Sequence, residues 1–221
     1  MSEKQLSFNE LGIEVADIYR QMGYGEATPD DQVRVETDRL MDEIGSWLRP
    51  RFCYFVDSQL PATFNTGQTI SRQLDGAEAY AFFIATAGIE YEAYQQRLKQ
   101  EGDMVRTYIA DALGSVIAEA CADQMECHLQ ASIDKLQWKH TNRFSPGYCG
   151  WSVTQQQLLF PLFRGHTCGV RLNDSSLMLP IKSVSGIIGL GRNVSRKDYA
   201  CHLCNQEQCY KRKKWKKKST Y

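Results

Sequence analysis

Residues 105–136 read VRTYIADALGSVIAEACADQMECHLQASIDKL and decide much of the fold. Apolar side chains recur along this stretch mostly at spacings of three, four and five, the pattern of one buried helical stripe. Asp111, Ser115, Glu119 and Asp123 follow one another at i, i+4 spacing, which places them in a row along a neighbouring face. The stretch therefore predicts a long helix with one face in a core and a polar row beside it.

Elements on both sides of this helix are predicted from composition and from turn residues. Pro29-Asp30-Asp31 begins a helix that Pro50 ends, since proline and acidic residues suit a first helical turn. The remaining elements are strands at 51–57, 78–87, 170–180 and 182–190, a turn at 145–147, a short helix at 155–163 and a hairpin tip at 173–176. Long helices mixed with clustered strands, without βαβ alternation, predict an α+β fold.

The length of 221 residues suits one domain with a substantial core. We expect residues 1–28 to form an N-terminal arm with a short helix near 8–22. Residues 29–200 would form the domain, and residues 201–221 a Cys-rich segment with a basic C-terminal tail.

The composition is that of a soluble globular protein, with 43% hydrophobic and 24% charged residues. Apolar runs such as residues 79–89 are too short to span a bilayer, and the polar N-terminus lacks a signal-peptide core. We therefore expect a cytoplasmic protein without a membrane partner. Its eight cysteines are then expected as free thiols or ligands rather than as a disulfide framework.

A sequence motif follows the long helix: Arg143-Phe-Ser-Pro-Gly-Tyr148, and then Ser183-Val-Ser-Gly186. Within the helix itself lies Ala112-Leu-Gly-Ser-Val-Ile-Ala-Glu-Ala120. The order of these three elements resembles the activation (reactivation) domain of cobalamin-dependent methionine synthase, here in a stand-alone form. The resemblance spans roughly residues 100–190 and implies a single domain with a twisted antiparallel sheet and long helices.

The resemblance implies that the chain binds S-adenosylmethionine. Arg143 would pair with the ligand's carboxylate, since guanidinium and carboxylate geometries match, and Glu119 would accept from its ammonium. Pro146-Gly147 would give a rigid turn where backbone groups approach the ligand closely. Tyr148 would either line the pocket or pack in the core, and the Ser183–Gly186 strand is expected to serve packing more than ligand contact.

Two departures from the family pattern lie close to this site. After Tyr148 the chain reads CGWSVTQ (149–155) in place of the family's usual Pro-Ala-x-Pro run. Ser115 stands where the usual form has an aspartate. The rim of the predicted pocket is therefore altered and one acidic contact is missing.

The activity that the resemblance implies is reductive reactivation in trans. The partner would be the cobalamin-binding module of a methionine synthase or another corrinoid protein, with a flavodoxin- or ferredoxin-type electron donor. Such a chain positions S-adenosylmethionine and needs no nucleophile or acid–base pair of its own, so no catalytic residue is predicted. The four histidines are scattered and form no recognisable triad.

The C-terminal segment has a second pattern, Cys201-x-x-Cys204-x4-Cys209. Three thiolates at this spacing can converge on zinc or an iron–sulfur cluster, whereas free or redox-active thiols are the alternative. The KRKKWKKK run at 211–218 holds seven of the 26 basic residues. It reads as a solubilising tail or as a docking segment for an acidic partner, and its single Trp does not favour nucleic acid.

Two other functions are left open by these patterns. The first is a metal-binding interaction protein that contacts nucleic acid through residues 201–221. The second is a scaffold that binds a corrinoid protein without any small ligand. Arg143 is the residue that discriminates between these functions and reactivation with S-adenosylmethionine.

Overall fold

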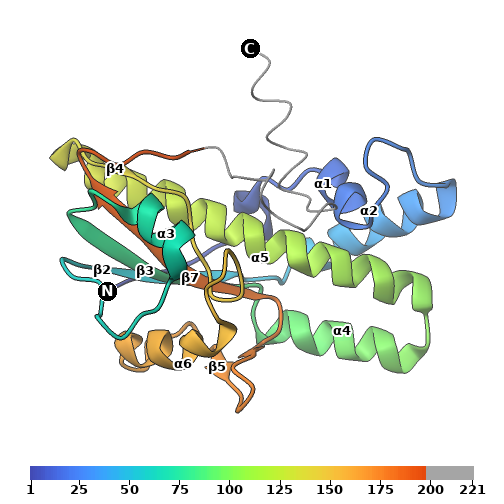
Figure 1. Ribbon diagram of the computed structural model, residues 1–221. Coiled ribbons are helices and arrows are strands. Elements are labelled where there is room, and N and C mark those ends of the chain that lie inside the picture. The colour runs from blue at the N-terminus through green and yellow to red at the C-terminus, as the bar shows by residue number, and fades with distance from the viewer. Residues whose placement is uncertain (198–221) are drawn as a thin grey trace.

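A five-stranded antiparallel sheet forms the centre of the molecule in the computed structural model, which describes residues 1–197 (Figure 1). The strand order is β1-β2-β3-β7-β4. The strands are β1 Ser2–Gln5, β2 Arg51–Asp57, β3 Ala79–Thr86, β7 Ser183–Gly191 and β4 Lys139–His140. The central strands β3 and β7 pair along their length, from Ala79 opposite Leu190 to Thr86 opposite Ser183.

Both faces of the sheet are covered, because successive side chains of a strand point to opposite faces. In β3, Phe83 belongs to one core cluster, whereas its neighbours Phe82 and Ile84 belong to another. All but one of the eight residues of β3 are buried. This explains why the strand reads as a continuous apolar run rather than as an alternating one.

The long helix α5, Met104–Ile133, lies along one face of the sheet (Figure 1). It begins where the Asp103 side chain accepts a hydrogen bond from the Arg106 backbone N–H at 3.0 Å. Leu113, Ile117 and Met125 are fully buried against the sheet and the other helices. The helix predicted from the apolar spacing is thus confirmed. The helices that share this core are α1 Val15–Gln21, α2 Asp31–Gly45 and α4 Ile89–Glu101.

The opposite face is covered by shorter elements. These are α3 Gly67–Leu74, α6 Gln156–Leu159, the 3-10 turns η3 Val153–Gln155 and η4 Phe160–Phe163, and the hairpin of β5 Arg171–Leu172 and β6 Met178–Leu179. Two further 3-10 turns are η1 Phe8–Leu11 and η2 Asp134–Leu136. Ile70, Leu159 and Phe163 fill the core on this side.

The predicted α+β domain with an antiparallel sheet is confirmed, and most differences concern short elements. The 170–180 stretch forms only two two-residue strands, around the predicted hairpin tip where Asn173 Oδ1 accepts from the backbone N–H of Ser175 and Leu177. Helices α3 and α4 were not predicted. Residues 1–28 supply the edge strand β1 and buried side chains such as Leu6 and Ile18, while the predicted domain boundaries stay predictions.

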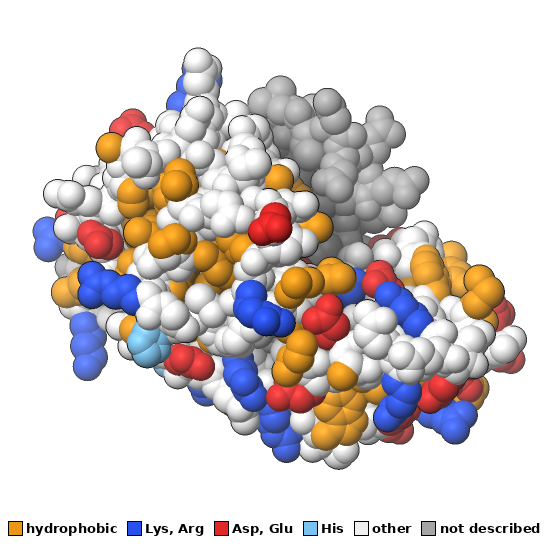
Figure 2. Space-filling view, turned by 90° about the horizontal axis from the view of Figure 1, so that it is seen from below, with side chains coloured by type: hydrophobic (Ala, Val, Ile, Leu, Met, Phe, Trp, Pro, Cys, Tyr) orange, Lys and Arg blue, Asp and Glu red, His pale blue; other side chains and the backbone are white. Residues whose placement is uncertain are grey.

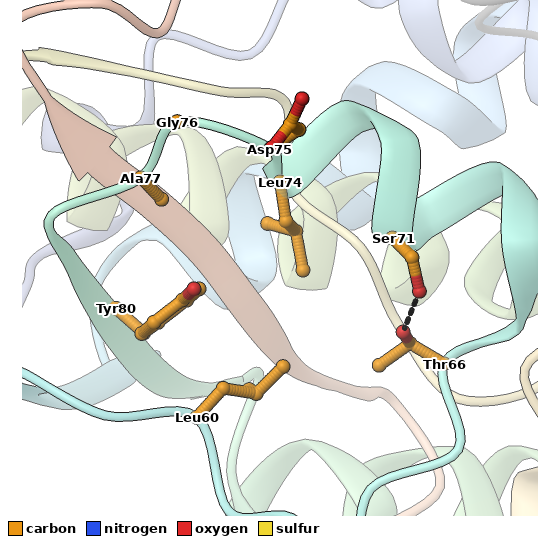
Figure 3. Close-up of a pocket in the computed structure, with 8 residues that line it drawn as sticks. All are labelled: Leu60, Thr66, Ser71, Leu74, Asp75, Gly76, Ala77 and Tyr80. Atoms are coloured by element: carbon orange, nitrogen blue, oxygen red, sulfur yellow. Dashed lines mark hydrogen bonds between the residues drawn. The ribbon is translucent and has the colours of Figure 1, made fainter.

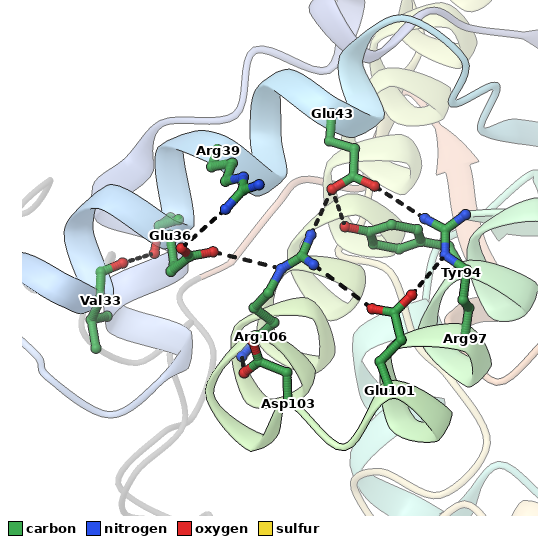
Figure 4. Close-up of polar contacts among 10 residues, drawn as sticks. Val33, Glu36, Arg39, Glu43, Tyr94, Arg97, Glu101, Asp103 and Arg106 are labelled. Atoms are coloured by element: carbon green, nitrogen blue, oxygen red, sulfur yellow. Dashed lines mark hydrogen bonds and ion pairs between the residues drawn. The ribbon is translucent and has the colours of Figure 1, made fainter.

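A network of ion pairs joins α2, α4 and the start of α5 (Figure 4). We call it the helix-junction cluster; its members are Glu36, Arg39, Glu43, Arg97, Glu101 and Arg106. Arg106 lies at its centre, with Nη2 at 2.7 Å from Glu43 Oε2 and Nε at 3.6 Å from Glu36 Oε2. The cluster fixes the N-terminal end of α5 against two other helices.

Among residues 1–197, no helix combines the length and apolar character needed to cross a lipid bilayer.

Candidate functional site

The polar row predicted on the long helix lies on the side of α5 that faces β7 and the segment after the helix. We add Glu126, which was not predicted, and call Asp111, Ser115, Glu119, Asp123 and Glu126 the α5 polar row. The four predicted members are partly or fully exposed to solvent, while Glu126 is 5% exposed. Each member contacts a cation that approaches from outside α5. The row is thus a line of carboxylates and one hydroxyl at the surface of the sheet–helix layer.

Arg143 lies against the middle of this row. Its Nη2 is 3.2 Å from Glu119 Oε2 and 2.6 Å from Asp123 Oδ1, and its Nη1 is 3.3 Å from Glu126 Oε2. The Arg143 side chain is 6% exposed. The structure therefore brings together two predicted site residues, Arg143 and Glu119, and adds two further carboxylates to them.

A second guanidinium joins this group. We call Glu119, Asp123, Glu126, Arg143 and Arg196 the Arg143 cluster; Arg196 Nη1 lies 3.0 Å from Glu126 Oε1. Its described ion pairs join three carboxylates with two guanidiniums. Two side chains of the cluster are 6% exposed, so water screens their charges less than it would on an open surface.

The Pro-Gly-Tyr turn is closed by its own backbone. Gly147 has a φ of +96°, which a residue with a Cβ rarely adopts, and its N–H donates to Trp151 O at 2.7 Å. The Trp151 N–H donates back to Tyr148 O at 2.9 Å. Pro146 is buried and Tyr148 is 60% exposed. The Tyr148 side chain therefore does not pack in the core, and its place at a ligand pocket stays a prediction.

The Ser-Val-Ser-Gly strand explains how this turn is attached to the sheet. Phe144 and Ile187 exchange two backbone hydrogen bonds of 2.9 Å. A Cβ added at Gly186 would lie 2.1 Å from Phe144 O, so only glycine lets the chain approach this closely. The Ser185 hydroxyl donates to Gln156 Oε1 at 3.1 Å. These contacts are packing contacts, and they place Arg143 over α5.

Lys182 is a cation near this site that belongs to none of the three motif segments. Lys182, directly before β7, places Nζ 2.9 Å from Asp111 Oδ1 and 3.0 Å from Ser115 Oγ. Its partner Ser115 is the position where the sequence departs from the usual aspartate. Lys182 thus contacts the polar row one helical turn before Glu119.

A separate hollow lies on the other face of the sheet (Figure 3). It has a volume of about 390 Å³ and is lined by Leu60, Thr66, Ser71, Leu74, Asp75, Gly76, Ala77 and Tyr80. Thr66 Oγ1 and Ser71 Oγ lie 3.1 Å apart and hydrogen bond to each other across its rim. Asp75 is its only charged lining residue. The hollow therefore lacks the paired charges of the Arg143 cluster.

Comparison with known proteins identifies the family. Residues 68–217, more than half of the chain, match the family described as "Vitamin B12 dependent methionine synthase, activation domain". The chain belongs to this family. The activation-domain fold is also found in a solved structure, the crystal structure of the MetH reactivation domain bound to AdoHcy. That structure shares 16% identity with a TM-score of 0.66, over 90% of this chain and 80% of that one. No curated protein matches the chain.

The activation-domain family resemblance was thus visible in the motif, but two residues of the site were not. Glu126 follows the i, i+4 row by three positions, and its burial became visible only once Arg143 and Arg196 were placed around it. Lys182 comes directly before the Ser-Val-Ser-Gly strand, and nothing in the local sequence signals its contact with α5.

The predicted metal ligands Cys201, Cys204 and Cys209 lie outside the described residues. Within residues 1–197, no group of three or more His, Cys, Asp and Glu side chains is arranged to hold a metal ion. The metal assignment therefore stays a prediction for the C-terminal segment.

Proposed function

We propose that this chain binds S-adenosylmethionine beside the α5 polar row and supports reductive reactivation of a cobalamin-dependent methionine synthase, or a related corrinoid methyltransferase, carried by another chain. Membership of the activation-domain family supports this proposal. The MetH reactivation domain of the same fold was solved with AdoHcy, the product of methyl transfer from S-adenosylmethionine. The single observation on this chain that carries the proposal is that the fold gathers Glu119, Asp123 and Glu126 of one helix around Arg143.

The carboxylates of the cluster suit the positive charge of the ligand. S-adenosylmethionine has a carboxylate, an ammonium and a sulfonium, and therefore one net positive charge, whereas S-adenosylhomocysteine lacks the sulfonium and is neutral. Two unit charges 4 Å apart attract by about 1 kcal/mol in water and about 4 kcal/mol at an effective dielectric of 20. Glu119 and Asp123 are both partly or fully exposed, so both are carboxylates that a cationic ligand can reach.

Arg143 has a defined part in this arrangement, because it holds Glu119 and Asp123 in place. Its predicted pairing with the ligand's carboxylate stays a prediction, and among the described contacts its guanidinium already faces three carboxylates. Pro146, Gly147 and Tyr148 are proposed as the rim, because the closed turn presents an exposed aromatic ring five positions after Arg143 in the chain.

The chemistry of the reaction belongs to the partner's cobalamin and to the ligand. One electron from a flavodoxin- or ferredoxin-type donor would reduce oxidised cobalamin on the partner. The sulfonium's methyl group would then pass to the reduced cobalt, which leaves S-adenosylhomocysteine. The residues of this chain bind and orient the ligand, which is why the site needs charges at fixed positions and no nucleophile.

Calorimetric titration of the full chain tests the proposal. We expect S-adenosylmethionine to bind, and Glu119→Gln to weaken it roughly tenfold, as for a hydrogen bond to a charged group. Binding of S-adenosylhomocysteine should change less. The matched control is Asp174→Asn, which removes a carboxylate from the exposed hairpin tip. A wild-type chain that binds neither nucleoside would contradict the proposal.

A second experiment tests the action in trans. A methionine synthase that lacks its own activation domain is inactivated by oxidation and mixed with this chain, S-adenosylmethionine and a reducing donor. We expect methionine formation to recover in the presence of the wild-type chain, and to recover poorly with Glu119→Gln. Recovery that is independent of this chain would contradict the assigned role.

The alternative function, nucleic-acid contact through residues 201–221, depends on residues outside the described part of the chain. On the face shown in Figure 2, basic and acidic side chains are interspersed rather than gathered in one basic stripe. Strong binding of DNA or RNA by a chain that does not bind S-adenosylmethionine would favour the alternative.

A further inference from the structure

Lys182 is a cation that the predicted site did not include. Its Nζ is held between Asp111 Oδ1 at 2.9 Å and Ser115 Oγ at 3.0 Å. Asp111 is 63% exposed, so its attraction for the ammonium is screened by water. Ser115 is a neutral partner. Lys182 therefore keeps more of its positive charge available than Arg143, which faces three carboxylates.

The stem of Lys182 is fixed in place by a glycine. A Cβ added at Gly114 would lie 2.9 Å from Lys182 Cγ and 2.5 Å from Tyr91 Cε1. The side chain of Lys182 is 12% exposed, because its methylenes lie on α5 while the ammonium reaches the polar row. A lysine fixed along its stem loses little further rotamer freedom when it binds an anion.

The spacing of the two cations along α5 matches the length of an amino-acid group. Ser115, which Lys182 contacts, and Glu119, which Arg143 contacts, are four residues apart on one helix face. Their Cβ atoms are therefore about 5–6 Å apart. In S-adenosylmethionine, three carbon atoms separate the carboxylate from the sulfonium, so both groups can reach the row at once.

We propose that Lys182 binds the carboxylate of S-adenosylmethionine and determines specificity for the amino-acid end of the ligand, an inference that rests on the proposed function. The ligand's carboxylate pairs with the ammonium of Lys182. The ligand's own ammonium and sulfonium groups then lie toward Glu119 and Asp123. The opposite orientation would place the carboxylate beside Glu119, Asp123 and Glu126, which Arg143 and Arg196 already contact. Ser115 is essential to this assignment, because an aspartate there would neutralise Lys182.

Two ligands and two substitutions test the assignment by calorimetry on the full chain. The ligands are S-adenosylmethionine and its decarboxylated form, which keeps the ammonium and the sulfonium but has no carboxylate. We expect Lys182→Met, which keeps the stem and removes the charge, to weaken S-adenosylmethionine roughly tenfold. Binding of the decarboxylated form should stay the same or improve. Arg143→Lys should weaken both ligands, because it releases the carboxylates that hold the cationic groups.

Two further variants sharpen the result. Lys182→Arg should restore most of the affinity for S-adenosylmethionine, and Ser115→Asp should reproduce the selective loss of Lys182→Met. Equal loss of both ligands in Lys182→Met, or no loss, would overturn the role of Lys182 and leave the proposed function standing. A loss in Arg143→Lys that is confined to S-adenosylmethionine would likewise overturn the role of Lys182 and leave the proposed function standing. A wild-type chain that binds neither ligand would overturn both proposals.

Discussion

Two ion-pair clusters lie on α5, and each has an arginine surrounded by three carboxylates. In the helix-junction cluster, Arg106 contacts glutamates that come from α2 and α4. In the Arg143 cluster, all three carboxylates come from α5 itself. The first cluster therefore ties separate helices together, whereas the second gathers charge on one face of a single helix.

The composition of the two clusters differs as well. The ion pairs of the helix-junction cluster join three glutamates with three arginines. The described ion pairs of the Arg143 cluster join three carboxylates of one helix with two arginines. A cluster that joins separate elements serves stability, whereas carboxylates gathered on one helix face form a surface that a ligand of opposite charge can contact. The comparison thus separates a structural network from a candidate site without reference to sequence motifs.

The largest expected effect comes from breaking the helix-junction cluster at its centre. Arg106→Met leaves the half-buried Glu36 and Glu43 without their central partner, and should lower the free energy of unfolding by about 3 kcal/mol. Urea denaturation followed by circular dichroism measures this. The control is Arg39→Met, whose side chain is 68% exposed and should matter by less than about 0.5 kcal/mol. Equal losses in the two variants would show that the cluster is not centred on Arg106.

The next effect comes from detaching the Arg143 segment from the sheet. Gly186→Ala places a Cβ against the backbone of Phe144, and should lower the free energy of unfolding by about 2 kcal/mol as an overpacked site does. Ligand binding should weaken in the same variant. Gly45→Ala is the control, because its added Cβ lies 3.7 Å from the nearest atom, which is an ordinary contact. Unchanged stability in Gly186→Ala would contradict the close approach.

A smaller effect is expected at alkaline pH in the helix-junction cluster. Burial, together with Glu43, raises the pKa of Tyr94 above its ordinary value of 10. The unfolded chain then loses the Tyr94 proton before the folded chain does, so this stabilisation is present below pH 10 and is lost as pH rises beyond it. The free energy of unfolding should fall by up to about 1 kcal/mol more in wild type than in Tyr94→Phe between pH 10 and 11. Parallel pH profiles for the two proteins would count against the raised pKa.

The smallest effect tests the carboxylates of the Arg143 cluster. Asp123 is 55% exposed and contacts Arg143, so Asp123→Asn should change the free energy of unfolding by less than about 1 kcal/mol. The same variant removes one negative charge from the proposed site, and should reduce the preference for S-adenosylmethionine over S-adenosylhomocysteine roughly threefold. Glu101→Gln in the helix-junction cluster should leave this preference unchanged. If both variants change the preference alike, the two clusters do not differ in function.

Local patterns predicted the elements that are long and periodic. The apolar spacing from Val105 to Leu136 predicted α5, because burial against one surface requires one apolar helix face. The apolar runs predicted β2, β3 and β7. Helix α4 escaped prediction because its buried side chains are tyrosines and a glutamine as well as leucine, which do not form an apolar stripe. Helix α3 is only eight residues long, and β1 reads SEKQ, a polar edge strand that only its pairing with β2 identifies.

The sequence by itself determined the long amphipathic helix, the α+β class, the polar row on α5 and the motif that places the chain in its family. Each of these depends on residues close together along the chain. The tertiary structure alone decided that Arg143 is surrounded by Glu119, Asp123 and Glu126, that Gly186 makes room for Phe144, and that Lys182 reaches Ser115 across 67 positions of sequence. The physical reason is that charge balance and close approach are properties of atoms brought together in space, and spacing along the chain carries no record of which cation meets which carboxylate.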